Sequence, residues 1–235
     1  MLPAPHLFPM GDQALIIEFG DRVDPVLSAR IATLAQRLRE SLPIGVLDIV
    51  PAYSTLALHY DPAAVGSGTA PYEALAEIIG NWLQTQSVET SAAGRLVEIP
   101  VCYGGTFGED LEALARMRNL SVEQVIAIHG GTDYHVHMLG FVPGFAYLGG
   151  LDARLATPRR DSPRPRVPAG SVGIGGEQTG VYPLDTPGGW QIIGRTPLQL
   201  FKPDASPPSL LNAGDVVRFV SISAQEFETQ AKAAR

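Results

Sequence analysis

The chain has 235 residues, of which 45% are apolar and 17% charged, so it can form one large domain or two ordinary ones with a substantial core. Its net charge of -7 argues against nucleic-acid binding, which needs a basic surface to replace counterions. The single cysteine, Cys102, excludes an internal disulfide and a thiolate metal cluster. No apolar run approaches the ~20 residues of a membrane helix, and residues 1–11 lack the lysine or arginine of a secretory signal. We therefore expect a cytoplasmic protein without a membrane partner.

The N-terminal third alternates between segments of strand type and helix type. Asp24 followed by Pro25 predicts the N-cap and first position of a helix, whose apolar residues recur at helical spacing. The expected elements are strands over 14–19, 46–50 and 55–60, helices over 25–42 and from Pro71 onward, a loop over 66–68 and a linker over 87–94. If a strand over 95–101 closes this pattern, the order is β-α-β-β-α-β, which is typical of the ferredoxin-like fold. That fold has many functions and indicates none by itself.

The middle of the chain predicts two helices and a strand. The first helix covers 110–117, and the second begins at Ser121, where Gln124 completes a capping box. Alternation over 134–139 then predicts a strand with His135 and His137 on one face.

Two histidines at this spacing can bind a metal, and His129 is close in sequence. However, no histidine follows His137, and metal sites usually need a third or fourth ligand. We therefore expect no metal. We expect instead a pair of histidines that is on the surface or hydrogen-bonded, and a place for His137 beside a ligand pocket is the alternative.

Residues 139–196 contain 12 of the 25 glycines and 7 of the 20 prolines of the chain within 58 residues. The same stretch carries large aromatic side chains and six arginines against four acidic residues. A disordered linker has no core for such aromatics, so we expect short packed strands with the chemistry in their turns. Glycine permits close approach there, and arginine offers forked donors to an anion.

Three apparent motifs in the chain do not fit their usual structural context. Residues 189–196 resemble a phosphate-binding loop, but the segment has strand character and Pro197 follows it. The Gly-Ser-Val-Gly run at 170–173 lacks a later histidine to activate its serine. Cys102 has only aromatic and glycine neighbours in sequence, which indicates a small buried side chain rather than a nucleophile.

Several longer strings resemble one protein family. They are LGFVPGFAYLGGL (139–151), TPRR (157–160), SPRPRVPAGSVGI (162–174) and QTGVYPLDTPGGWQIIGRTPLQLF (178–201), flanked by IPVCYGG (99–105) and LLNAGDVVRF (210–219). The family includes the kinase inhibitor KipI, the B subunit of bacterial 5-oxoprolinase and the subunit 1 domains of allophanate hydrolase. The resemblance implies an α+β protein with a ferredoxin-like domain over 1–92 and a cyclophilin-like β-barrel over 93–235. The short strands and Gly/Pro turns after residue 95 agree with a barrel.

The resemblance also implies an activity. A 5-oxoprolinase opens the lactam of 5-oxo-L-proline to L-glutamate and hydrolyses ATP. In that case ATP with Mg is held by the complex, not necessarily by this chain, which has no tightly bound cofactor of its own. The implied partners are the C subunit, in a hetero-oligomer, and the A subunit. The alternative is a KipI-like inhibitor of a sensor histidine kinase, and a weaker third interpretation is a prolyl isomerase.

The candidate ligand-binding residues follow from these motifs. Those expected to contact substrate or nucleotide are His137, Phe145, Arg159, Arg164, Gln178, Thr179, Trp190 and Arg195, with Arg166 as a further local cation. Those expected to set loop geometry are Pro143, Gly144, Pro187 and Gly189. An arginine that clamps a backbone carbonyl, and a core role for Trp190, are the alternatives. The acids of this stretch are Asp152, Asp161, Glu177 and Asp185, and none is a convincing general base. The catalytic residues are therefore unknown, and we expect a partner to supply some of them.

Overall fold

The computed structural model describes residues 5–65, 70–86 and 94–233. The chain divides into two compact units, Met1–Ala93 and Gly94–Arg235. The predicted loop over 66–68 and all but the last residue of the predicted linker over 87–94 lie outside the described residues. Within the described ranges, no helix combines the length and the apolar character that crossing a membrane requires.

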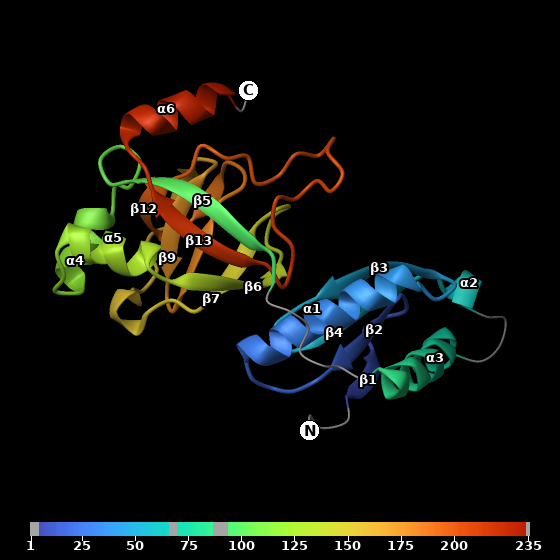
Figure 1. The fold of residues 1–235 in the computed structure, drawn as a ribbon. Helices are drawn as coiled ribbons and strands as arrows, with labels where there is room; N and C mark the ends of the chain where they lie inside the picture. Colours follow the sequence, from blue (N-terminus) through green and yellow to red (C-terminus); the bar gives the residue numbers. More distant parts are fainter. Residues whose placement is uncertain (1–4, 66–69, 87–93, 234–235) are drawn as a thin grey trace. The chain divides into compact units, whose positions relative to one another are not determined.

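The N-terminal unit is an antiparallel sheet with helices on one face (Figure 1). Its strands are β1 (His6–Pro9), β2 (Ala14–Glu18), β3 (Val46–Pro51) and β4 (Thr55–Tyr60), in the order β1-β2-β4-β3, and its helices are α1 (Pro25–Glu40), α2 (Pro62–Val65) and α3 (Pro71–Thr85). Asp24 caps α1 as predicted, because its side chain accepts hydrogen bonds from the Val26 and Leu27 amides. Apolar side chains of α1 and α3 pack on the sheet and form the core of this unit.

The strand predicted over 95–101 does not complete the N-terminal sheet. It forms β5 (Leu96–Tyr103), which pairs in parallel with β13 (Val216–Ser221) over six residues. The edge beside β2 is occupied instead by β1, which the sequence analysis did not predict. The prediction was wrong here because strand character is local, whereas the choice of partner depends on residues more than a hundred positions away.

The C-terminal unit is a closed seven-stranded barrel in the order β10-β7-β6-β13-β5-β12-β9. The remaining strands of the barrel are β6 (Asp133–Leu139), β7 (Ala146–Gly149), β9 (Ser171–Gly175), β10 (Gln178–Val181) and β12 (Gln191–Arg195). Its interior is apolar, with Ile99, Val136, Leu148, Ile174 and Phe219 among the buried residues. The whole chain is therefore a mixed α and β protein with a closed barrel.

The C-terminal unit has further elements, of which α4, α5 and α6 are labelled beside the barrel strands in Figure 1. They are α4 (Leu111–Met117), α5 (Val122–Gly130), the short 3-10 helix η1 (Ala153–Leu155), α6 (Ala224–Ala233) and a separate two-stranded sheet of β8 (Arg164–Val167) and β11 (Thr186–Gly188). The predicted capping box is present at the start of α5, where Ser121 and Gln124 exchange hydrogen bonds. The sheet of β8 and β11 carries two of the predicted site residues, Arg164 and Pro187.

Strand β6 alternates up to its bulge as the sequence predicts. His135 is exposed and His137 is buried, yet both lie on the outer face, because His135 pairs with Gly149 and His137 packs over the same glycine, whereas Val136 faces the core. The pairing of β6 with β7 shifts in register between Val136 and Met138, which leaves His137 as the extra residue of a bulge. The prediction that His135 and His137 share one face of the strand is therefore confirmed, although only His137 is covered by its surroundings.

Candidate functional site

Trp190 lies on the outer wall of the barrel in a seat made by glycines. A Cβ atom at Gly175 would lie 2.6 Å from the indole ring, and one at Gly173 or Gly180 would lie 3.2 Å from the Trp190 side chain. These glycines belong to β9 and β10, so two neighbouring strands present no side chain where the indole ring packs on them. The glycines of the sequence motif are therefore needed for close packing.

An aromatic cluster covers this seat and forms a second core outside the barrel interior. Phe145 makes edge-to-face contacts with Tyr147, Tyr182 and Trp190, with ring centroids 5.1 to 5.6 Å apart. Phe145 is only 2% exposed and Trp190 only 5%. Such burial matches the alternative given for Trp190, a packing role. The two rings exclude water from this region but do not line an open pocket.

Asp110 holds two arginines against the edge of this cluster. Its Oδ1 accepts hydrogen bonds from Arg160 Nη1 at 3.1 Å and Arg164 Nη2 at 2.8 Å, and its Oδ2 accepts from the Ile192 amide at 2.6 Å. The carboxylate is buried, and Glu109 lies 3.5 Å from the same Arg164 nitrogen. Charged hydrogen bonds in a buried setting fix both arginines firmly.

Sequence reasoning treated Asp110 only as the start of a helix. It does stand at the N-cap of α4, yet its side chain makes no capping bond, because the carboxylate is used for the arginines instead. No local signal could have revealed this role, since its partners lie 50 and 54 residues further along the chain.

The charges of Arg159 and Arg164 both act on the Tyr182 hydroxyl group. Burial raises the pKa of Tyr182, whereas a hydrogen bond from the Trp190 backbone and the charges of both arginines oppose that rise. Arg159 is exposed and, among the described residues, forms no ion pair or hydrogen bond. Nη1 of Arg164 is buried, and within the described chain no acceptor lies within hydrogen-bond distance of it. Both arginines therefore keep donors that no described residue accepts from.

Two loops are joined next to these arginines. The Arg160 amide donates to the Gly189 carbonyl at 2.7 Å, and the Gln191 side chain donates to the Pro158 carbonyl at 3.0 Å. A Cβ atom at Gly189 would lie 3.7 Å from the Pro163 ring. The predicted geometric residue Gly189 therefore lies where the 158–163 loop meets the segment that leads into β12.

Arg195 lies in a different arrangement. Its Nε donates to the Ala169 carbonyl at 2.9 Å, which is the backbone clamp given as the alternative for these arginines. The Ala169 amide in turn donates to Asp185 at 2.7 Å, and Asp185 also accepts from Arg166. The structure thus separates Arg195 and Arg166 from the pair Arg159 and Arg164.

Thr179 points into the barrel and is fully buried there. Its hydroxyl donates to the Gly173 carbonyl at 3.0 Å, so it must accept from His129 Nε2 at 2.9 Å. His129 Nδ1 is then the acceptor for the Tyr103 hydroxyl at 2.7 Å. This chain of hydrogen bonds uses the only proton of the Thr179 hydroxyl inside the barrel. Thr179 therefore has a structural role in the barrel wall.

His137 and Gln178 face the outer side of the same wall. Gln178 precedes the inward Thr179 on β10, and successive strand residues point to opposite faces. A Cβ atom at Gly149 of β7 would lie 1.9 Å from His137 Nε2, so the imidazole rests directly over that glycine. The absence of a side chain at Gly149 is therefore what gives His137 its place.

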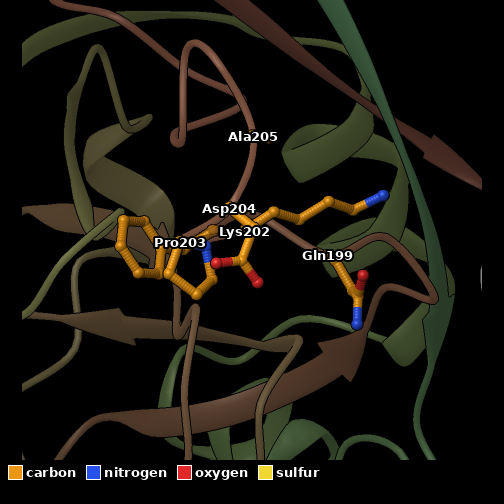
Figure 2. A pocket seen from close by; sticks show the side chains of 6 residues that line it. Gln199, Lys202, Pro203, Asp204 and Ala205 are labelled. Carbon is orange, nitrogen blue, oxygen red and sulfur yellow. The ribbon is translucent and has the colours of Figure 1, made fainter.

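The predicted loop residues Pro143 and Gly144 lie beside a surface hollow. Gly144 has a φ of +80°, and a Cβ atom there would come within 2.7 Å of Phe201. Figure 2 shows the hollow, which is lined by Gln199, Phe201, Lys202, Pro203, Asp204 and Ala205. Sequence reasoning did not single out these lining residues. We place the candidate site at the two arginines instead, because the hollow is open and offers no buried, unpaired donor among its described residues.

The histidines do not assemble into a metal site. His129 is inside the barrel, His137 is on the outer wall, and His135 is exposed. Throughout residues 5–65, 70–86 and 94–233, no three His, Cys, Asp or Glu side chains are grouped closely enough to hold an ion. Cys102 is buried, as expected for a small core residue.

Comparisons with known proteins agree with the resemblance found in the sequence. The family described as the carboxyltransferase domain, subdomains C and D, matches residues 5–211. The chain is 45% identical over 226 residues to a protein named as the B subunit of 5-oxoprolinase from Bacillus subtilis, covering 93% of each chain. It is 44% identical over 212 residues to the protein of the same name from Escherichia coli O157:H7, covering 90% of this chain and 93% of the other.

Solved structures show the same fold. A conserved uncharacterized protein from Pyrococcus horikoshii is 45% identical, with a TM-score of 0.56 over 94% of this chain and 100% of the other. The urea amidolyase of K. lactis is 18% identical with a TM-score of 0.74, and 98% of this chain matches 15% of that much longer protein. With motifs, barrel and relatives in agreement, the chain belongs to the family of carboxyltransferase-domain subdomains C and D, together with the bacterial proteins named as B subunits of 5-oxoprolinase.

Proposed function

We propose that this chain is the B subunit of an ATP-dependent 5-oxoprolinase, which opens 5-oxo-L-proline to L-glutamate together with the C and A subunits. The observation that supports this most strongly is the 45% identity to a 5-oxoprolinase B subunit over 93% of both chains. A match of this length covers both compact units. It therefore relates the whole chain, and not one domain alone, to that protein.

The chemistry explains why such an enzyme uses ATP. A lactam is stabilised by resonance, so water attacks its carbonyl carbon poorly. Transfer of the terminal phosphoryl group of ATP to the lactam oxygen activates this carbon and releases ADP. Water then adds to the carbon, the ring C–N bond breaks to free the amine, and the acyl phosphate that remains is hydrolysed to the carboxylate and phosphate. The phosphoryl transfer needs cations that neutralise the charge on the phosphoryl oxygens. Mg held by the complex and the guanidinium groups of Arg159 and Arg164 are suited to that task.

The candidate site also supports a role within a larger complex. The buried acid that binds Arg164, Asp110, is also bound to Arg160 and the Ile192 amide, so it is not positioned as a general base. We infer that the C or the A subunit completes the catalytic machinery. The same reasoning implies a hetero-oligomer that acts in the cytoplasm, in which the barrel is of the cyclophilin-like class.

A coupled assay tests the proposal. This chain is co-expressed with its cognate C and A subunits, 5-oxoproline and Mg-ATP are supplied, and glutamate and phosphate are followed together. We expect equal amounts of the two products, and loss of both when this chain is omitted. Equal glutamate formation without the chain would show that the complex does not require it, and inhibition of a sensor kinase would then be the function to test.

A further inference from the structure

Phe141 differs from the other large aromatic residues because it is exposed. It is 62% exposed, whereas every other Phe, Tyr or Trp that the structure describes is buried or half-buried. A single exposed apolar side chain is ordinary in folded proteins and would by itself indicate nothing. What distinguishes Phe141 is the backbone that presents it.

The backbone at Phe141 is strained. Its φ is +68°, and the Val142 amide donates to the Gly140 carbonyl at 2.8 Å, which closes a γ-turn of the rare form with a positive φ. A residue with a Cβ atom rarely adopts this conformation, whereas glycine adopts it at little cost. Strain of this kind persists where a particular side chain is needed, and it is common at functional sites.

The rest of the turn between β6 and β7 holds Phe141 in this conformation. The Gly140 amide donates to the Phe145 carbonyl, and the Phe145 amide donates to the Val142 carbonyl, both at 3.0 Å. In addition, a Cβ atom at Gly144 would lie 2.7 Å from Phe201 Cβ, so the turn packs directly on that residue. The turn is therefore fixed by its own hydrogen bonds and by the segment that contains Phe201.

The Phe141 ring packs on the buried aromatic cluster. It contacts Phe145 edge to face, with ring centroids 5.5 Å apart. This contact orients the ring while most of its surface stays in water. An aromatic side chain that is already oriented loses little entropy on binding, and such anchors dominate the affinity of many protein interfaces.

The same cluster leads from Phe141 to the candidate site. Val167 and Ile192 both belong to it. Val167 lies on β8 together with Arg164, and the Ile192 amide donates to Asp110. The candidate site relies on a second subunit for its general base, so that subunit has to approach the face of the barrel that carries this cluster.

We propose that Phe141 anchors the C subunit by inserting its ring into an apolar pocket of that subunit. This inference rests on the proposed function, in which the C subunit forms a hetero-oligomer with this chain. It adds the place at which the chain holds its partner. It also explains why a strained phenylalanine stands where a glycine would fold more easily.

Affinity for the C subunit tests the anchor. The full-length chain is titrated with the cognate C subunit by isothermal titration calorimetry. We expect Phe141→Gly to raise the Kd about 30-fold or more, as is typical for loss of a buried aromatic anchor, and Phe141→Leu to restore part of the affinity. Leu96→Ala is the matched control, because it removes apolar surface that is 47% exposed on β5 and should leave the Kd within about twofold.

Stability separates an anchor from a residue that only supports the fold. Phe141→Gly should unfold at a higher urea concentration than Phe141→Ala, because alanine keeps the Cβ atom that a positive φ disfavours. Equal or reversed midpoints would contradict the proposal, since the ring would then not be held under strain.

Kinetics of the assembled complex separate docking from contact with substrate. At a saturating concentration of the C subunit, Phe141→Gly should recover the kcat and the KM for 5-oxoproline of the unmodified chain within about twofold. A KM for 5-oxoproline that stays raised under these conditions would overturn the docking role and make Phe141 a residue that contacts substrate.

The inference and the proposed function fail in different ways. If Phe141→Gly binds the C subunit as tightly as the unmodified chain does, or weakens only binding of the A subunit or self-association, the anchor is wrong and the proposed function stands. If the complex makes glutamate equally well without this chain, the proposed function itself is wrong, and the anchor with it.

Discussion

Single atoms decide the packing at the outer wall of the barrel. A Cβ atom at Gly175 would come within 2.6 Å of the Trp190 indole, and the same atom at Gly149 would come within 1.9 Å of His137. Both distances are far below van der Waals contact, so the neighbouring ring must move if either glycine is replaced. The glycines of this family's motifs therefore place an indole and an imidazole on the face that also carries Gln178.

We expect Gly175→Ala to destabilise the barrel by about 1 to 3 kcal/mol, because an added methyl group overpacks the seat of Trp190. The free energy of unfolding is measured in urea with Trp190 fluorescence, in a Trp82→Phe background. Gly80→Ala is the control, because a Cβ atom at this helical position meets nothing within 4 Å. It should leave the Trp190 transition unchanged. Equal stability of the two variants would contradict the proposed seat.

The buried imidazole of His129 makes the barrel sensitive to acid. Burial lowers the pKa of His129 from 6.5 to about 3. The unfolded chain therefore takes up a proton as the pH falls below 6.5, whereas the folded chain does not until about pH 3. Stability from this group is complete above pH 6.5 and declines as the pH falls from 6.5 to 3, by at most about 1.4 kcal/mol per pH unit.

This pH dependence can be measured by urea unfolding between pH 7 and 4. In His129→Gln the slope of the free energy of unfolding against pH should be shallower by up to one proton, even though the variant is less stable overall. His135→Gln, which removes an exposed ring from β6, controls for the general effect of losing a histidine. An unchanged slope in His129→Gln would show that the imidazole is already protonated, or solvated, in the folded state.

At the scale of elements, Asp110 joins parts of the chain that no single strand or helix connects. It stands before α4, binds the loop that carries Arg160 and the first residue of β8, and accepts a hydrogen bond from β12. The small sheet of β8 and β11 is thereby fixed against the barrel. Arg164 of the candidate site lies at this junction, so its geometry depends on the Asp110 carboxylate.

Asp110→Ala should lower the free energy of unfolding by about 3 kcal/mol or more, because it leaves two arginines and a backbone amide without their acceptor. Chemical denaturation measures the loss. Asp185→Ala is the comparison, because that carboxylate forms an exposed pair with Arg166 and should cost about 1 kcal/mol at most for the pair itself. Similar losses in the two variants would mean that the Asp110 cluster is not a buried anchor.

At the scale of the whole molecule, the order of elements could be predicted well and their pairing could not. The helix that begins at Pro25 and the capping box at Ser121 depend on contacts within four residues, so the sequence indicates them directly. The pairing partner of β5 is β13, which lies far away in the chain. The prediction that the strand over 95–101 completes the N-terminal sheet was therefore wrong.

The candidate site shows the same division. The motifs identified the arginines, aromatics and glycines of 139–196, together with the family. They could not separate Arg195, which clamps the Ala169 carbonyl, from Arg159, which has no ion pair among the described residues. Nor could they show that Thr179 faces His129 inside the barrel while Gln178 faces outward.

Element types, family membership and the residue types available for chemistry could all be inferred before the fold was known, because periodicity, capping and motif identity are properties of neighbouring residues. The folded chain was needed to show which strand closes the barrel, which glycine makes room for His137, and which arginines Asp110 fixes. These choices depend on groups that closure of the barrel brings together, such as Asp110 and Arg164, which are 54 residues apart.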